Sequence, residues 1–251
     1  MTSEELKDFL DAKTALYNRP DFIETDPVRV PHRYYVKEDI EISGFLAATL
    51  SWGNRKMIIR SAERLMELMG NSPYDFVMEA REEQIENFVH RTFNLTDLNF
   101  FLRSLRNLYI NHGGLEQVFE TYAENDSLQP AIHHFKRLFF EIEHPPRTTK
   151  HVSDPRKGSA AKRINMFLRW MVRKDQNGVD LGIWKSLSPS LLSCPLDVHT
   201  GRVARKLGLL TRKANDARAL EELDQNLRRL DPKDPVRYDY ALFGLGVFEG
   251  F

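Results

Sequence analysis

The sequence has one cysteine, Cys194, among its 251 residues, and no run of apolar residues long enough for a membrane span. A single cysteine excludes an internal disulfide and a cysteine-ligated cluster, and a membrane helix needs about 20 apolar residues. The eight histidines are scattered and give no zinc spacing. The first residues are acidic and amphipathic, unlike the basic and then apolar order of a signal peptide. These absences predict a cytoplasmic protein with no metal site and no membrane partner.

The formal net charge is zero, but the charges are unevenly distributed along the chain. Residues 145–174 contain nine Lys or Arg residues and one acid, Asp154, which gives this segment a charge of +8. Residues 202–213 add five basic residues and no acid, so the rest of the chain carries −13. Two concentrated basic segments are typical of a surface that binds a polyanion such as nucleic acid, and equally of a solvated helical surface.

Apolar residues recur at spacings of three and four along most of the chain, and this pattern predicts an all-α protein. Glycine and proline separate the helices, as at Gly70, Pro145 and Gly178. We find no internal repeat, low-complexity segment or alternating strand pattern in the sequence. The predicted helices cover about residues 39–52, 55–70, 73 onward, 96–112, 115–122, 128–143, 160–174, 198–209, 216–230 and 238–250.

A basic turn followed by an amphipathic helix occupies residues 155–165, with the sequence PRKGSAAKRIN. The first N–H groups of a helix have no intrahelical partner, and together with the helix dipole they form a site for a phosphate. Gly158 allows a close backbone approach, and Ser159 can cap the helix. The surrounding basic side chains would attract a nucleic-acid backbone of any sequence. The same pattern also fits an ordinary capped helix with basic flanks.

Two stretches resemble a known superfamily. The spacing Gly158-x-x-x-Lys162-x-x-Asn165 is similar to the hairpin and second helix of the endonuclease-III-like, helix-hairpin-helix DNA glycosylases. Residues 195–209, PLDVHTGRVARKLGL, are similar to the stretch that carries the catalytic aspartate of that superfamily. The long gap between the two stretches most resembles the archaeal 8-oxoguanine DNA glycosylase branch. The chain also resembles a bacterial family of unknown function, DUF2400, which shares the strings LRWMVR and PLDVHT.

The resemblance implies a two-lobed, helix-hairpin-helix glycosylase-like fold with Lys162 and Asp197 as the catalytic pair. The Lys162 amine would attack the sugar C1′ and form a Schiff base, and the Asp197 carboxylate would stabilise positive charge on the sugar. Ala160 stands where the superfamily hairpin usually has a second glycine, a position that alanine can occupy if its φ is negative. The whole chain would form one unit, with a central lobe at about 40–145, a hairpin and catalytic region at 146–210, and 1–39 and 211–251 packing as terminal helices.

The implied function is DNA repair, in which a damaged base, an oxidised purine, is excised from double-stranded DNA and the abasic site is cleaved by β-elimination. The protein would be associated with the bacterial nucleoid, with no obligate protein partner evident. No organic cofactor is implied, although the hairpin could bind a monovalent cation. The implied DNA-binding residues are Arg156, Lys157, Gly158, Ser159, Arg163, His199 and Arg202. The candidates for filling the gap left by an extruded base, or for lining its pocket, are Trp52, Asn54 and Trp184.

Three other interpretations remain open at the level of sequence. Asp197 is also a typical helix N-cap, and a single helical lysine is commonly solvated, so the chain could be a non-catalytic DNA-binding protein on the same fold. It could instead be an enzyme that acts on RNA or on a modified nucleotide. Finally, it could be a helical interaction protein whose basic segments contact an acidic partner. Salt-dependent DNA binding would separate this last interpretation from the others.

Overall fold

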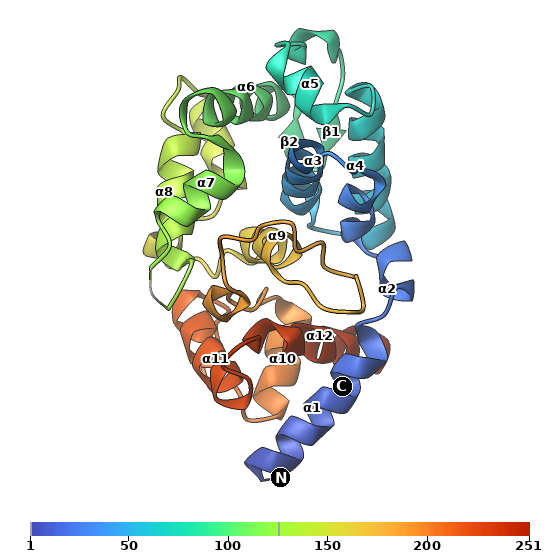
Figure 1. Cartoon of the computed structure of the whole chain (residues 1–251), viewed down its shortest axis with the longest axis vertical. Coiled ribbons are helices and arrows are strands. Elements are labelled where there is room, and N and C mark those ends of the chain that lie inside the picture. Colours follow the sequence, from blue (N-terminus) through green and yellow to red (C-terminus); the bar gives the residue numbers. More distant parts are fainter. Residues whose placement is uncertain (1, 125) are drawn as a thin grey trace.

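The computed structural model describes residues 2–124 and 126–251, and this part of the chain is mostly helical (Figure 1). The all-α prediction is therefore confirmed. The α-helices are α1 (Ser3–Tyr17), α2 (Asp21–Glu24), α3 (Lys37–Leu50), α4 (Arg55–Leu68), α5 (Pro73–Met78), α6 (Leu95–Asn111), α7 (Gly114–Thr121), α8 (Gln129–Phe139), α9 (Lys162–Val172), α10 (Val198–Lys206), α11 (Ala217–Leu230) and α12 (Asp239–Phe248). Short 3-10 turns connect them, including η1 (Pro27–Arg29), η4 (Pro146–His151) and η5 (Pro155–Lys157).

A small β-hairpin in the described chain was not predicted by the helical pattern. Its strands β1 (Val89–His90) and β2 (Phe93–Asn94) pair antiparallel, with His90 opposite Phe93. Each strand has only two residues, which is too few to show an alternating pattern in the sequence. The turn between the strands contains Arg91 at a φ of +57°, a conformation that residues other than glycine rarely adopt.

Side chains at the helix starts explain several of the helix boundaries. The sequence predicted that α6 begins at about residue 96, whereas its N-cap is Asn94. The Asn94 side chain accepts a hydrogen bond from the Asp97 backbone N–H, and the Asp97 carboxylate accepts one from the Asn94 backbone N–H. This capping box satisfies two backbone donors at once and moves the start of the helix toward the N-terminus.

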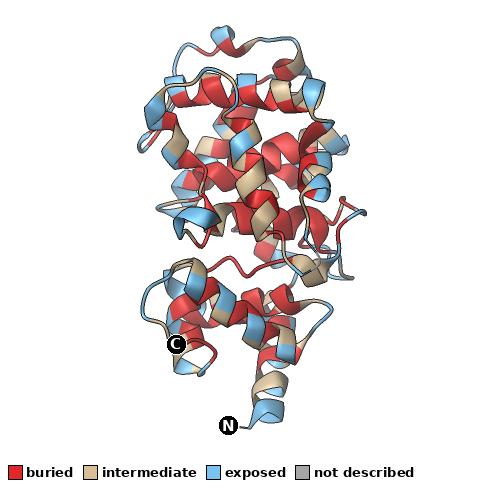
Figure 2. Cartoon of the chain, turned by 90° about the vertical axis from the view of Figure 1, so that its left-hand side faces the viewer, coloured by how far each residue is buried: buried red, intermediate tan, exposed pale blue. Residues whose placement is uncertain are grey.

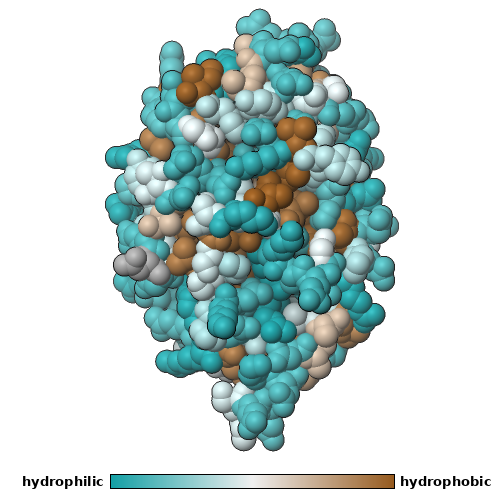
Figure 3. Space-filling view, in the orientation of Figure 1, coloured by the Kyte–Doolittle hydropathy of each residue, from teal (hydrophilic) through white to brown (hydrophobic). Residues whose placement is uncertain are grey.

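The buried apolar residues form two clusters (Figures 1 and 2). The larger cluster lies in the upper part of Figure 1 and is built mainly from α3 to α9, with Phe45, Phe101 and Phe135 among its fully buried rings. The smaller cluster lies below it and is built from α10, α11, α12 and one residue of α1, Leu10. The face seen in Figure 3 is mostly hydrophilic, with hydrophobic atoms gathered across its middle.

The two clusters cross the lobe boundaries that the sequence predicts, most clearly at α9. The sequence placed the end of the central lobe at about residue 145, but α9 packs in the larger cluster through Phe167, Trp170 and Met171. At Gly44 of α3 the Met171 and Phe167 side chains of α9 lie directly against the α3 helix. The helix that carries Lys162 is therefore part of the larger body, while Asp197 caps a helix of the smaller one.

Candidate functional site

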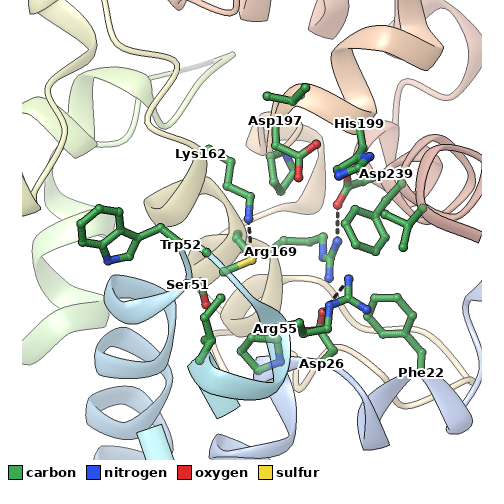
Figure 4. A pocket seen from close by; sticks show the side chains of 18 residues that line it. Phe22, Asp26, Ser51, Trp52, Arg55, Lys162, Arg169, Asp197, His199 and Asp239 are labelled. Carbon is green, nitrogen blue, oxygen red and sulfur yellow. Dashed lines mark hydrogen bonds and ion pairs between the residues drawn. The ribbon is translucent and has the colours of Figure 1, made fainter. Parts of the chain in front are cut away.

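A pocket of about 640 Å³ lies between α9 and the starts of α10 and α12 (Figure 4). This volume is within the range of small-molecule sites, roughly 300–1,000 Å³. The residues that line the pocket come from both ends of the chain and from its middle: Phe22, Asp26, Pro27, Ser51, Trp52, Gly53, Arg55, Ile58, Lys162, Met166, Arg169, Pro195, Asp197, Val198, His199, Asp239, Phe243 and Val247. Four residues predicted from sequence are among them: Trp52, Lys162, Asp197 and His199.

Lys162 and Asp197 stand at the starts of two different helices and face the same pocket (Figure 4). Both are half-buried. The Lys162 Nζ lies 3.5 Å from the Met166 sulfur one turn along α9, and among the described residues it forms no ion pair. Asp197 caps α10 by accepting a hydrogen bond from the Thr200 backbone N–H at 2.9 Å. One carboxylate oxygen therefore holds the helix start, which fixes the direction of the other.

The link between α3 and α4 forms a second side of the pocket. The guanidinium of Arg91 lies 4.8 Å from the centre of the Trp52 ring, and the Trp52 indole N–H is buried without a hydrogen-bond partner among the described residues. Gly53 has a φ of +109°, and a Cβ there would lie 2.6 Å from Arg91 Nη1. The hairpin tip therefore packs directly on this link and holds Trp52 at the pocket.

Two phenylalanine rings from opposite ends of the chain form a third side. Phe22 in α2 and Phe243 in α12 pack edge to face, with ring centres 6.1 Å apart. The Arg55 guanidinium lies 4.7 Å from the centre of the Phe243 ring and 3.9 Å from the Asp26 carboxylate. An aromatic and guanidinium surface of this kind offers stacking contacts to a flat heterocycle.

A buried chain of alternating charges reaches the pocket at Asp239. The Arg169 guanidinium pairs with Asp239 and, at 3.1 Å, with Asp180. Arg173 pairs in turn with Asp180 at 3.0 Å and with Asp234 at 2.9 Å. Burial raises the pKa of Asp239 to about 6, although the charge of Arg169 opposes this shift. Ion pairs within the interior are retained where each charge has a partner.

The turn before α9 differs in detail from the predicted phosphate site. Gly158 has the expected left-handed backbone, with a φ of +84°, and Ala160 has a negative φ, as its position requires. Ala161, however, has a φ of +44° and is the N-cap of α9, with no side-chain cap. The Ser159 hydroxyl instead accepts a hydrogen bond from the Ala161 backbone N–H at 3.1 Å.

Internal hydrogen bonds use the carbonyl oxygens of this turn. The Asp154 carbonyl accepts from the backbone N–H of Lys157 and Ser159, and the Gly158 carbonyl accepts from that of Ala217. The Ala160 carbonyl accepts from the Asn165 side-chain amide at 2.9 Å. These three carbonyls therefore have protein donors as partners, and the binding of a monovalent cation at this turn stays a prediction.

Two predicted site residues, Arg163 and Trp184, have structural roles away from the pocket. The Arg163 guanidinium donates to the carbonyls of Thr49 and His151, and burial lowers its pKa to about 10, so it is not a free DNA-binding group. Trp184 is 1% exposed in the larger cluster, and its indole N–H donates to the Glu41 carboxylate at 2.6 Å. That burial excludes Trp184 from stacking on a base in the pocket.

Four other predicted residues do not line the pocket: Asn54, Arg156, Lys157 and Arg202. Asn54 caps α4 by accepting a hydrogen bond from the Met57 backbone N–H, and it lines a neighbouring groove. Arg202 donates to the Gly246 carbonyl at 2.8 Å and so ties α10 to α12. Arg156 and Lys157 are exposed on the turn that leads to Lys162, where their contact with DNA stays a prediction.

The structure also shows that several charges of the two basic segments are paired within the protein. Within residues 145–174, Arg169 and Arg173 are buried in ion pairs with carboxylates from other parts of the chain. In the second segment, Arg212 pairs with Asp216. Counting charges along the sequence therefore overstated the positive charge at the surface, because ion pairs formed by folding are not visible in a local count.

Sequence reasoning missed most of the pocket. Phe22, Asp26 and Asp239 line it but belong to no recognised stretch, and Arg169, although it lies in the string LRWMVR, was not predicted to be a site residue. Among the described residues no helix is long and apolar enough to cross a membrane, and no group of three or more His, Cys, Asp or Glu side chains could hold a metal.

A family model described as protein of unknown function, DUF2400, matches residues 26–248. The chain belongs to this family. The DUF2400 match includes Lys162, Asp197 and Asp239, whereas Phe22 lies before its first residue. No curated protein and no solved structure matches the chain.

Proposed function

We propose that this DUF2400 protein is a DNA glycosylase with abasic-site lyase activity, on a helix-hairpin-helix glycosylase-like fold, and that it acts on an oxidised purine. One observation carries the proposal: Lys162 and Asp197, which the sequence resemblance picks out independently, line the same pocket. The aromatic rings of Phe22 and Phe243 supply a wall suited to a flat base. A base inside a duplex is out of reach of such a pocket, so the substrate nucleotide would be extruded from the helix.

The proposed reaction uses the amine of Lys162 and the carboxylate of Asp197. The unprotonated Lys162 amine attacks C1′, the N–C1′ bond forms, and the bond from C1′ to the base breaks with its electron pair going to the base. The Asp197 carboxylate stabilises the positive charge that develops on the sugar, as carboxylates do in glycoside hydrolysis. The sugar ring then opens, the proton passes from the nitrogen to the ring oxygen, and the Schiff base forms. Loss of a proton from C2′ and departure of the 3′ phosphate complete β-elimination.

Sodium borohydride trapping tests this proposal. Reduction of the Schiff base on duplex DNA with 8-oxoguanine or an abasic site would leave a covalent adduct with the wild-type protein. Lys162→Gln should abolish the adduct, because the amide cannot attack C1′, while DNA binding is retained. Asp197→Asn should form adduct far more slowly, because the amide does not stabilise the charge on the sugar.

The matched control is Lys157→Gln, which removes an exposed lysine of the same basic turn that does not line the pocket. This variant should bind DNA more weakly and still form the adduct at saturating protein. An adduct that persists in Lys162→Gln, or no adduct with the wild-type protein on either substrate, would make the lyase proposal wrong. Intact DNA binding in the second case would favour a non-catalytic DNA-binding protein.

A further inference from the structure

Asp239 differs from Asp197 in its surroundings, although both carboxylates line the pocket. Asp239 is 4% exposed at the start of α12, whereas Asp197 is half-buried. The Asp239 oxygen Oδ2 pairs with Arg169, but Oδ1 is approached only by the Cys194 thiol, at 3.6 Å. A thiol is a weak hydrogen-bond donor, so Oδ1 has no strong partner within the described chain and is open to a group bound in the pocket.

The buried charges around Asp239 favour a proton on this carboxyl group. Two guanidinium groups, Arg169 and Arg173, face four carboxylates, Asp239, Asp180, Asp234 and Asp175. The carboxylates outnumber the guanidinium groups, and in a buried site a bound proton is the least costly way to reduce the excess negative charge. The nearby charge of Asp197 acts in the same direction, while Lys162 opposes it.

We propose that Asp239 is the general acid of the pocket and protonates the base as it leaves. This inference rests on the proposed function. Asp239 begins as the neutral acid, and its proton passes to the base nitrogen that receives the electron pair of the broken bond to C1′. The resulting Asp239 carboxylate is stabilised by Arg169, which already points at it, and later takes a proton from water (Figure 4). Asp197 thus acts as an ion that stabilises charge on the sugar, and Asp239 acts as the acid that protonates the base.

This role predicts a pH dependence with a defined sign. The acid form of Asp239 is populated below its pKa of about 6, so base excision should slow as the pH rises through that value. The other ionisable groups that face or adjoin Asp239 come from α9, α10, α4, the segment before η1 and the segment before α10: Lys162, Arg169, Asp197, His199, Arg55, Asp26 and Cys194. A variant in which residue 239 has no carboxyl proton separates the contribution of Asp239 to the pH dependence from the contributions of these other groups.

The decisive experiment compares Asp239→Asn with Asp180→Asn. Asp180 accepts from the same Arg169 but does not line the pocket, so the two variants remove the same charge from the same cluster. Single-turnover excision of the base and borohydride trapping on a pre-formed abasic site are measured for each over pH 5 to 8. Folding is checked by circular dichroism and urea unfolding.

We expect Asp239→Asn to lose base excision by about 10²-fold or more and to lose the pH dependence near 6. Its trapping on an abasic site should match that of Asp180→Asn, because no base remains to be protonated there. Equal excision rates in the two variants, or equal loss of excision and trapping in Asp239→Asn, would overturn the role of Asp239. A wild-type protein that traps neither substrate would overturn the proposed function together with this inference.

Discussion

Replacing Gly244 with alanine tests whether α1 is packed directly onto α12. Gly244 lies in the middle of α12, and a Cβ at this position would fall against the ring of Tyr17, well inside van der Waals contact. Moving the ring away would disturb its stacking on Phe248, with ring centres 5.5 Å apart, and the hydrogen bond that its hydroxyl donates to Glu249.

The expected magnitude follows from two opposing effects. Alanine is more favourable than glycine inside a helix by about 0.5–1 kcal/mol. Forcing a methyl group into a packed contact costs roughly 1–3 kcal/mol. We therefore expect Gly244→Ala to lower the free energy of unfolding by about 1–2 kcal/mol, which corresponds to a fall in Tm of roughly 2–8 °C for a chain of this size.

Gly44→Ala is the matched control, because Gly44 also lies within a helix and its added Cβ would meet the end of the flexible Met171 side chain at 2.9 Å. Met171 can adapt, so this substitution should change the free energy of unfolding by less than about 1 kcal/mol. Urea unfolding measures both variants and the double variant Tyr17→Ala/Gly244→Ala, which should be less destabilised than the sum of its parts. Equal stability of the two glycine variants, or strict additivity in the double variant, would refute the packing argument.

Three further predictions concern charge. Burial raises the pKa of Glu41 to about 7, so the native state binds the Glu41 proton more tightly than the unfolded chain does, and the free energy of unfolding falls as the pH rises from about 5 to 7. In Glu41→Gln this fall, measured by urea unfolding, should be smaller by roughly 3 kcal/mol. The same pH dependence of stability in the wild type and the variant would contradict this prediction. Arg163→Met leaves two buried carbonyls without donors and should lower the free energy of unfolding by about 1–3 kcal/mol for each, without changing the salt dependence of DNA binding. Lys157→Gln should leave stability unchanged and reduce the slope of log K against log salt by about 1, and an unchanged slope would exclude a phosphate contact.

The sequence predicted the helices well because their signals are local. Apolar spacing and capping residues lie within one or two turns of each other, so α9, α10 and α11 fall where the pattern placed them. The placement of Lys162 and Asp197 at helix starts also followed from local signals, although their meeting at one pocket was implied only by resemblance.

The rest of the pocket depends on contacts between distant parts of the chain. Asp239 follows a proline-rich turn and has no local pattern that separates it from an ordinary helix-start acid. What sets Asp239 apart is its buried pairing with Arg169, which lies 70 positions earlier in the chain. Trp184 illustrates the opposite error, because the sequence made it a candidate for the base pocket, whereas Glu41, 143 positions away, accepts a buried hydrogen bond from it.

The joining of α1 to α12 has a consequence for how the protein is made. Lys13 pairs with Glu249, 236 positions along the chain, and Leu10 belongs to the same cluster as Leu242 and Leu245. During synthesis α1 is made before α12 and stays without this partner until α12 has emerged from the ribosome. Since α12 also supplies Asp239 and Phe243, the pocket cannot close before α12 has been made, and a chain released before residue 239 has no complete site.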